Sequence, residues 1–390
     1  MAEWIECKIS DIGTVVGGAT PSTKKPENYE NGTIAWITPK DLSTFTGRYI
    51  QRGERNITEV GLKSCSTQLL PKDTVLFSSR APIGYVAIAA NEVCTNQGFK
   101  SVVPNENTNP LFLYYLLKHN KDKIEGMGSG TTFKEVSGNT MKNIVVSVPT
   151  DKKVQKRISS MLGSIDDKIE ENERINNNLE QQAQALYKNI FCIHSDIDTK
   201  HISLSDLMDY AGGSQPPASE FVFSERDGYI RFVQIRDYDT DSHITYIPDS
   251  PKNKLCEEHD IMIARYGASL GRICFGINGA YNVALAKVFP KKSFFREFLR
   301  CYLSSRTFYE GINNKGGRSA QAGFNQSDIN SFEIDFPVDE TIVKKFECTV
   351  APMFEQRLQL KKENQHLASL RDTLLPKLMS GELDVSNVEI

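Results

Sequence analysis

The sequence predicts an α/β (α+β) fold in which two similar globular domains are separated by two long antiparallel coiled-coil helices, with a pseudo-twofold internal repeat. Three observations predict it: two heptad seams, the same punctuation before each seam, and the same order of short motifs in each half. The chain has 390 residues, enough for two ordinary domains and two long helices. The predicted boundaries are 1–150 (first domain), 151–195 (first helix), 196–338 (second domain) and 339–390 (second helix and tail).

The first seam begins after Asp151, where apolar residues recur at alternating spacings of four and three. This heptad pattern is typical of a helix that packs against a partner, because a single amphipathic helix cannot bury its own stripe. The second seam begins after Asp339 and supplies that partner. The side chains expected to pair the helices are Ile158, Leu162, Ile165, Ile169, Asn176, Leu179 and Leu186 in the first, and Phe346, Val350, Met353, Asn364, Leu367 and Leu374 in the second.

The same Pro-x-Asp pattern precedes each seam, in Val148-Pro149-Thr150-Asp151 and in Phe336-Pro337-Val338-Asp339. Proline keeps the incoming chain extended, and the aspartate is expected to cap the helix through its carboxylate. A helix of about forty residues spans roughly 60 Å, so the pair would act as a spacer. Asn176 and Asn364 stand at equivalent seam positions, where a buried polar pair would fix the register. One seam alone would equally suit an ordinary helical hairpin, but the duplication favours the spacer.

The same short motifs occur in the same order in both predicted domains, so the repeating unit is one domain followed by one helix. The matched segments are 17–21 and 212–216 (glycine turn), 34–41 and 230–237 (aromatic strand followed by aspartate), 73–88 and 260–275 (strand, arginine loop, strand), 96–104 and 282–290 (asparagine before a strand that ends in proline), and 126–134 and 315–321 (glycine-rich loop).

A duplicated domain on a spacer is the geometry of bipartite recognition, in which two half-sites on one duplex are read at a distance. Two similar domains joined by two helices of equal length are related by an approximate twofold axis only if the helices are antiparallel. Because the loop residues of the two domains differ, we expect each domain to read a different half-site of an asymmetric target.

Arginine, lysine and hydroxyl side chains in the matched loops are the candidate DNA contacts. Arg80 and Arg265 stand in equivalent loops, and each guanidinium can pair with a guanine edge, although a salt bridge or a phosphate contact is equally open. Contacts to the sugar-phosphate backbone are expected from Lys24, Lys25, Thr131, Thr132 and Lys134 in the first domain, and from Arg318, Ser319 and Gln321, with Tyr266 and Arg272 nearby, in the second.

Composition excludes several other classes of function. The net charge of −3 argues against a protein that wraps nucleic acid unaided, and eight scattered cysteines predict neither disulfides nor a metal site. No apolar stretch is long enough for a membrane span, which predicts a soluble, cytoplasmic protein. The chain lacks an [N/D]-P-P-[F/Y] methyltransferase motif, a glycine-rich cofactor loop after a strand and the phosphate-binding loop of a translocase. We therefore expect no catalytic residue and no cofactor in this chain.

The order of these motifs resembles the specificity subunit of type I restriction-modification enzymes over essentially the full length. The segment 370–383, which begins Leu370-Arg371-Asp372, also resembles the ending common in that family. The resemblance implies two target-recognition domains, helices that hold two methyltransferase subunits, and a non-catalytic reader of double-stranded DNA. It further implies S-adenosylmethionine in the methyltransferases, and ATP and magnesium in two motor restriction subunits, so that the complex would be a DNA adenine methyltransferase and an ATP-dependent endonuclease.

The residues alone also allow two other functions. A two-lobed scaffold could bind proteins without any DNA, although loops rich in Gly, Thr, Ser, Lys and Arg at matching places weigh against it. A fused methyltransferase or nuclease is the second alternative, and the missing cofactor motifs weigh against that one.

Overall fold

Contacts within the chain divide it into two units in the computed structural model, which describes residues 3–80, 82–130, 134–193, 196–316, 323–385 and 388. Unit 1 comprises Met1–Glu171 with Glu363–Ile390, and unit 2 comprises Asn172–Lys362. The long helices α7 (Lys152–Lys188) and α11 (Glu340–Met379) each contribute to both units.

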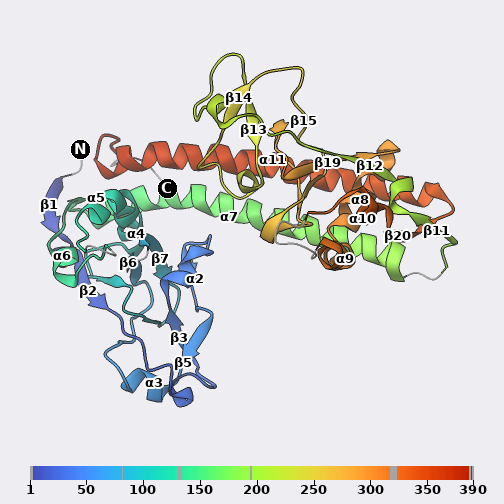
Figure 1. The fold of residues 1–390 in the computed structure, drawn as a ribbon. Helices are drawn as coiled ribbons and strands as arrows, with labels where there is room; N and C mark the ends of the chain where they lie inside the picture. Colours follow the sequence, from blue (N-terminus) through green and yellow to red (C-terminus); the bar gives the residue numbers. More distant parts are fainter. Residues whose placement is uncertain are drawn as a thin grey trace. The chain divides into compact units, whose positions relative to one another are not determined.

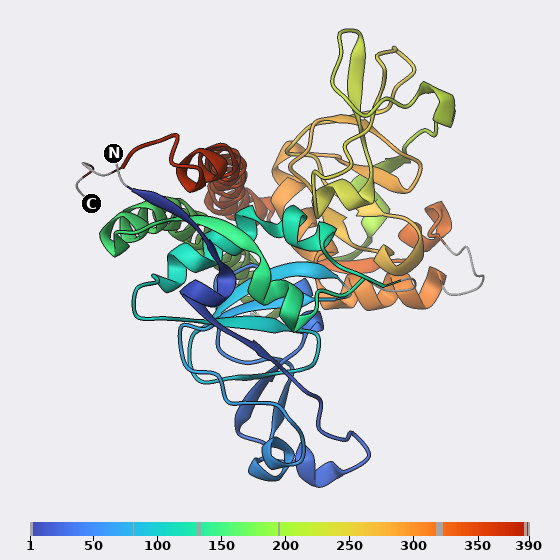
Figure 2. The same ribbon diagram turned by 90° about the vertical axis from the view of Figure 1, so that its left-hand side faces the viewer.

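The described residues of unit 1 form three sheets, whose strands can be followed in Figures 1 and 2. A five-stranded sheet lies beside α7, and a three-stranded sheet lies farther from that helix together with α3 (Glu59–Lys63). The five-stranded sheet has the order β2 (Gly13–Gly17), β9 (Lys100–Pro104), β6 (Val75–Ser79), β7 (Ile83–Ala89) and β4 (Tyr49–Ile50). The three-stranded sheet has the order β5 (Arg55–Ile57), β3 (Ile34–Ile37) and β8 (Cys94–Thr95), and β1 (Trp4–Lys8) pairs with β10 (Val145–Pro149).

Short helices complete unit 1 and connect it to α7. Helix α4 (Pro110–His119) packs beside β7, and all of its residues from Phe112 to Leu117 are buried. The remaining bounds are α1 (Ile9–Ile12), η1 (Pro26–Asn28), α2 (Pro39–Ser43), α5 (Lys121–Gly126) and α6 (Gly138–Asn143). The core of unit 1 includes Val154, Ile158 and Leu162 of α7, and it is completed by Leu378, Met379 and Val385 at the other end of the chain.

In the described part of unit 2, the strands form two four-stranded sheets and a two-stranded one. The first has the order β12 (Met208–Gly212), β19 (Leu285–Pro290), β16 (Met262–Ala264) and β17 (Ile273–Cys274). The second, which projects away from α11 (Figures 1 and 2), has the order β14 (Tyr246–Pro248), β13 (Tyr229–Val233), β18 (Gly279–Tyr281) and β15 (Leu255–Cys256). Strand β11 (Thr199–Ser203) pairs with β20 (Glu333–Pro337).

Helix α8 (Arg296–Leu303) packs against the ends of the two long helices, where Phe298 contacts Tyr187 and Phe191. Tyr187 of α7 and Phe346 of α11 contact each other there, with ring centroids 6.2 Å apart, and both belong to the largest apolar core of the unit. The bounds are η2, a π-helical turn (Asn189–Ile193), η3 (Leu204–Asp206), η4 (Ala218–Glu220), η5 (Ile235–Tyr238), η6 (Gly267–Ser269), η7 (Ser293–Phe295), α8 (Arg296–Leu303), α9 (Arg306–Gly316) and α10 (Gln326–Asn330).

The predicted repeat is present in the strand pairing. The order β2-β9-β6-β7 in unit 1 corresponds to β12-β19-β16-β17 in unit 2. In the second sheet of each unit, one strand pairs antiparallel with one neighbour and parallel with the other: β3 pairs with β5 and β8, and β13 pairs with β14 and β18. The β6–β7 hairpin and the β16–β17 hairpin each contain a glycine with positive φ, Gly84 at 99° and Gly271 at 81°. The two domains therefore share a common topology to which unit 1 adds β4 and unit 2 adds β15, and the predicted fold class is confirmed.

The predicted glycine turns also match in detail. A Cβ atom on Gly18 would lie 2.1 Å from the carbonyl oxygen of Thr95, and one on Gly213 would lie 2.2 Å from the carbonyl oxygen of Asn282. Such distances exclude any side chain, so glycine is required where the turn crosses the neighbouring strand.

The two aspartates predicted to begin the long helices do cap them. Asp151 accepts a hydrogen bond of 2.7 Å from the amide of Lys153, and Asp339 accepts one of 2.9 Å from the amide of Thr341. Helix α11 then runs without interruption through Pro352 and Pro376. Among the described residues, no helix combines the length and the apolar character that crossing a membrane requires.

Candidate nucleic-acid interface and helix pairing

Arg80 lies at the corner between β6 and β7. Strand pairing continues to Ser79 and Ile83, so the arginine loop predicted within 73–88 is short, and the hairpin contains a bulge between Phe77 and Ser79. The backbone of Arg80 pairs with Glu135, and its Nη1 lies 3.8 Å from the Glu135 carboxylate. Ser129 also pairs with Glu135 through the backbone, which brings Arg80 next to the glycine-rich loop and to exposed Lys134.

Arg265 directly follows β16, but its loop is longer than that of Arg80 and contains the turn η6. Its guanidinium lies 5.1 Å from the ring centre of Tyr266 and 5.9 Å from that of Phe324. It donates one long hydrogen bond of 3.5 Å to the carbonyl of Val283, and its Nε has no partner among the described residues. Since no carboxylate of the described chain lies within 4 Å, this cation is not neutralised internally.

In each unit, the corner that holds the arginine lies next to a residue that follows the glycine-rich loop. In unit 1 the arginine lies against the residues that follow the loop 126–134, and in unit 2 a Cβ on Gly323 would lie 2.2 Å from the Tyr266 ring. The chemistry differs, because Arg80 has a carboxylate neighbour and Arg265 has aromatic ones. Two equivalent corners with different side chains can present different hydrogen-bonding surfaces.

The other candidates are not all brought to these corners. Lys24 and Lys25 are exposed in the turn before η1. The η1 turn packs against α3, which lies beside the three-stranded sheet. Arg272 is directed to Asp239, with bonds of 2.9 and 2.6 Å, and the hydrogen bond from Arg272 lowers the pKa of that aspartate. Five candidates lie outside the described residues: Thr131, Thr132, Arg318, Ser319 and Gln321.

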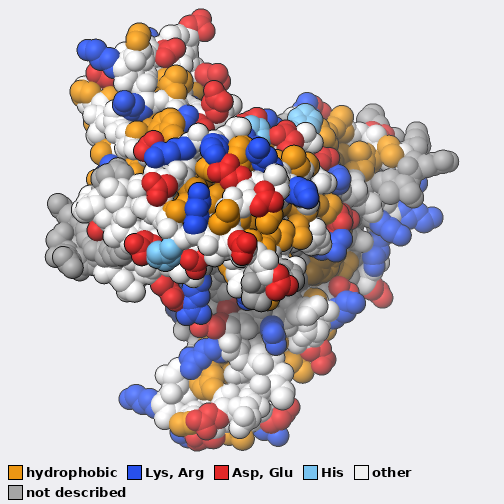
Figure 3. Space-filling view, turned by 90° about the vertical axis from the view of Figure 1, so that its right-hand side faces the viewer, with side chains coloured by type: hydrophobic (Ala, Val, Ile, Leu, Met, Phe, Trp, Pro, Cys, Tyr) orange, Lys and Arg blue, Asp and Glu red, His pale blue; other side chains and the backbone are white. Residues whose placement is uncertain are grey.

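Charges of both signs are mixed on the surface. On the face drawn in Figure 3, the described Lys and Arg side chains are interspersed with Asp and Glu. No group of three or more His, Cys, Asp or Glu in the described part of the chain is arranged to hold a metal ion. On the face shown, electrostatic attraction to a polyanion would therefore be local rather than spread over a broad basic surface.

The residues predicted to pair the helices divide into two groups by burial. Those near the helix ends that pack into the domain cores are buried: Ile158, Leu162, Phe346 and Val350. The others are half-buried: Ile165, Ile169, Asn176, Leu179, Leu186, Met353, Asn364, Leu367 and Leu374. The partners run in opposite directions in each unit, as Asp166 with Arg371 and Ile169 with Asn364 show in unit 1.

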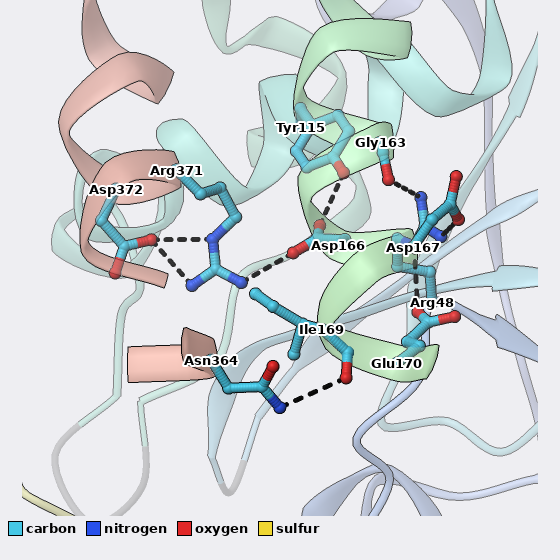
Figure 4. Close-up of polar contacts among 10 residues, drawn as sticks. All are labelled: Arg48, Tyr115, Gly163, Asp166, Asp167, Ile169, Glu170, Asn364, Arg371 and Asp372. Atoms are coloured by element: carbon cyan, nitrogen blue, oxygen red, sulfur yellow. Dashed lines mark hydrogen bonds and ion pairs between the residues drawn. The ribbon is translucent and has the colours of Figure 1, made fainter. Parts of the chain in front are cut away.

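The two seam asparagines belong to different units, Asn176 to unit 2 and Asn364 to unit 1, and their pairing stays a prediction. Asn364 donates a bond of 3.3 Å to the main-chain carbonyl of Ile169 (Figure 4), and the Oδ1 atom of Asn176 has no hydrogen-bond partner among the described residues. The hydrogen bond to Ile169 links the two helices within unit 1, and a polar contact of this kind favours one register there.

Sequence reasoning missed the polar residues that attach α7 to the first domain. Arg48 is buried, and Figure 4 shows its guanidinium pointing to the carbonyl of Gly163 and to the carboxylates of Asp167 and Glu170. Burial by itself would lower the pKa of Arg48, but the hydrogen bonds to Glu170 and Asp167 outweigh it and raise that pKa. No local pattern marks Arg48, because its partners stand 119 and 122 residues away in the sequence.

Comparisons with known proteins agree with one another. A family model described as "Type I restriction modification DNA specificity domain" matches residues 1–181 and 197–351. The chain is 35% identical over 419 residues to the Type I restriction enzyme MjaIX specificity subunit of Methanocaldococcus jannaschii, covering 99% of this chain and 95% of that protein. It is 22% identical over 474 residues to the HindI specificity subunit of Haemophilus influenzae, covering 98% and 100%. The crystal structure of the S subunit of a type I restriction-modification system from M. genitalium matches with a TM-score of 0.62 at 16% identity, covering 97% and 96%.

Proposed function

This chain belongs to the type I restriction-modification specificity family, and from that membership we propose that it reads a bipartite, asymmetric DNA target with one half-site per domain. Specificity subunits of this family are in general non-catalytic. Methylation and cleavage would then be carried out by partner subunits.

The observation that carries this proposal is the repeated corner. Each unit has the same order of four strands and holds an arginine near a residue that follows the glycine-rich loop, yet Arg80 faces Glu135 while Arg265 faces Tyr266 and Phe324. Base edges in the major groove are read by hydrogen-bonding side chains of this kind. A shared framework with different side chains supports reading two different half-sites.

We further propose that α7 and α11 dock two methyltransferase subunits, and that two restriction subunits join the complex. S-adenosylmethionine would bind to the methyltransferases, and ATP and magnesium would serve the restriction subunits. The complex would act as a DNA adenine methyltransferase and an ATP-dependent endonuclease. The net charge of −3 and the mixed charges on the face in Figure 3 support the assignment of base reading to this chain and of most of the basic DNA-binding surface to its partners.

The test is to purify the tagged chain from its native cells, identify the bound proteins by mass, and map methylated adenines on DNA incubated with the complex and S-adenosylmethionine. We expect a methyltransferase at two copies per chain and methylation at one gapped, asymmetric sequence. The untagged strain is the control for non-specific recovery. Recovery of the chain without a methyltransferase, or methylation without a gapped sequence, would contradict the proposal.

A two-lobed scaffold that binds proteins without DNA is the alternative. It would give stable protein complexes with no site-selective methylation and no preference among DNA sequences. The unneutralised guanidinium of Arg265 favours the DNA reader, because a cation of this kind suits a polar or anionic ligand.

A further inference from the structure

The segments that lead into β9 and β19 belong to the repeat, but the proposed function uses neither of them. Gln97 stands before β9, and Val283 stands before β19. The asparagine before Gln97 donates its amide to the carbonyl of Ile37 at 3.0 Å. The asparagine before Val283 donates its amide to the carbonyl of Val233 at 3.1 Å. The backbone therefore holds Gln97 and Val283 at equivalent positions of the two units.

This position lies beside the corner that holds the arginine in each unit. The carbonyl of the residue after Gln97 accepts a bond of 2.7 Å from the amide of Ser79, which directly precedes Arg80. The carbonyl of the residue after Val283 accepts a bond of 2.8 Å from the amide of Arg265. The guanidinium of Arg265 also donates to the carbonyl of Val283 itself. A ligand that contacts either corner therefore passes close to Gln97 or to Val283.

Both side chains are accessible from solvent. Gln97 is exposed, and Val283 is 37% exposed. The hydroxyl of Thr20, in the first glycine turn, donates a hydrogen bond to the Oε1 atom of Gln97. The Nε2 atom of Gln97 has no partner among the described residues, and its Oε1 atom keeps a second lone pair. An amide held by Thr20 thus still offers one donor and one acceptor to a ligand.

The two side chains suit different bases. In the major groove, adenine presents the N7 acceptor beside the N6 donor, and a glutamine amide pairs with both. Thymine presents a C5-methyl group there, which apolar side chains contact. A valine side chain forms no hydrogen bond, so the exposed methyl groups of Val283 suit thymine. Single exposed valines are common on protein surfaces, but this one occupies the place of Gln97, and its own carbonyl binds Arg265.

We infer that Gln97 and Val283 are specificity-determining residues of the DNA reading proposed above, on which this inference rests. Gln97 pairs with an adenine in the half-site of the first domain, and Val283 contacts the methyl group of a thymine in the half-site of the second. Thr20 is a positioning residue, because its hydroxyl holds the amide of Gln97 before DNA binds and so reduces the entropy lost on binding.

The experiment measures the binding of duplexes that carry the target mapped by methylation. The complex of this chain with its methyltransferase subunits is titrated against labelled duplexes at one salt concentration, and fluorescence anisotropy gives the Kd. Each adenine is replaced in turn by 7-deazaadenine, which lacks the N7 acceptor, and each thymine by uracil, which lacks the methyl group. We expect an adenine in one half-site whose replacement weakens binding about fivefold, and a thymine in the other whose replacement weakens it about threefold.

Variants of the chain assign each effect to its side chain. In Gln97→Ala the effect of 7-deazaadenine should disappear at one adenine, and in Val283→Ala the effect of uracil should disappear at one thymine, because the contact is already missing. All other replacements should weaken binding as they do for the unmodified chain. Gln68→Ala and Val338→Ala remove the same kinds of side chain from exposed positions and should leave every effect unchanged.

Thr20 is tested through the same adenine. Thr20→Val keeps the shape of the side chain but removes the hydroxyl, so the effect of 7-deazaadenine at that adenine should become smaller. Thr20→Ser keeps the hydroxyl and should restore the full effect. Equal weakening of all duplexes by Thr20→Val would contradict the positioning role and show that Thr20 only supports the turn.

Three outcomes would overturn the roles of Gln97 and Val283. They are an effect of the modified base that persists in the corresponding variant, equal weakening of all duplexes by that variant, and an adenine and a thymine that lie in the same half-site. Circular dichroism checks the folding of each variant. A complex that methylates no gapped sequence contradicts the proposed function and the inference with it, whereas any of the three outcomes in a complex that does methylate one contradicts the inference alone.

Discussion

Arg371 of α11 donates a hydrogen bond of 2.8 Å to the carboxylate of Asp166 in α7. The same carboxylate, only 8% exposed, accepts a bond of 2.6 Å from the hydroxyl of Tyr115 in α4. Burial, followed by the charge and hydrogen bond of Asp166, raises the pKa of that tyrosine. One acidic side chain therefore connects both long helices to the core of unit 1.

Replacing this carboxylate should destabilise unit 1. Asp166→Ala leaves Arg371 and Tyr115 without their shared partner, and breaking a buried ion pair costs about 3 kcal/mol. We expect a loss of this size in the free energy of unfolding, measured by urea denaturation. Asp372→Ala is the matched control, since Asp372 also pairs with Arg371 but is 65% exposed, and its loss should be about 0–1 kcal/mol. Equal losses would contradict the special role of Asp166.

Replacing the arginines of the two corners should change different half-sites. Arg80→Ala should weaken recognition of one half-site by about 1–3 kcal/mol, and Arg265→Ala should weaken the other by a similar amount. The measurement is methylation of duplexes in which each position of the target is varied in turn. Lys72→Ala, an exposed lysine of unit 1 in the turn before β6, is the control. An equal loss on all sequences would identify either arginine as a phosphate contact.

Adding a methyl group to the first glycine turn should disrupt unit 1. Gly18→Ala would place its Cβ 2.1 Å from the carbonyl oxygen of Thr95 and 2.2 Å from that of Asn96, so the strands must separate. We expect a loss of at least about 2 kcal/mol in the free energy of unfolding. Gly126→Ala serves as the control, because no atom lies within 4 Å of the added carbon. Similar melting temperatures for the two variants would be inconsistent with this packing.

Removing an aromatic ring from α11 should destabilise unit 2. Phe346 is buried against Tyr187 and Phe191 of the neighbouring helical segment, with ring centroids 6.2 and 5.2 Å apart. Phe346→Ala leaves a cavity and should cost about 3–5 kcal/mol, measured by thermal or urea unfolding. Ile193→Ala, at a position that is 62% exposed, should change stability little. A small effect of Phe346→Ala would show that this ring does not hold the helices together.

The ion pairs of His201 should make stability depend on pH. Hydrogen bonds to Asp335 and then Glu333 raise its pKa above the ordinary value of 6.5. Because the folded pKa is raised, the stabilisation is fully present below about 6.5 and is lost as the pH rises through the folded value. We expect His201→Gln to lower the melting temperature more at pH 5.5 than at pH 8.5. Titration of the imidazole by NMR provides the direct check, and an imidazole pKa at or below 6.5 would contradict it.

The elements with local signals were predictable from the sequence. Heptad spacing identified both long helices, and the aspartates at 151 and 339 cap them because capping depends on neighbours two residues away. The repeat of strand order followed from the matched motifs. Interactions between distant residues had no such signal: Arg48 reaches α7 over more than a hundred positions, and the pairing of Arg272 with Asp239 depends on how two loops of unit 2 approach each other.

The candidate site was predictable only in part for the same reason. Equivalent loops indicated that Arg80 and Arg265 would correspond, but the direction of each guanidinium is set by Glu135 in one unit and by aromatic rings in the other. Lys24 and Lys25 shared the favoured residue type with Lys134, yet they stand in a turn near α3. Residue type indicates possible chemistry, while the neighbours that direct it come from the fold.

The core of unit 1 has a consequence for the order of events on the ribosome. Leu378, Met379 and Val385 complete that core, while unit 2 is built from one continuous segment, Asn172–Lys362. During synthesis, every residue of unit 2 is made before the last residues of unit 1 are available. Unit 1 thus begins before unit 2 in the chain but buries its full core after it, and a nascent chain must protect that exposed apolar surface until residues 378–385 have been made.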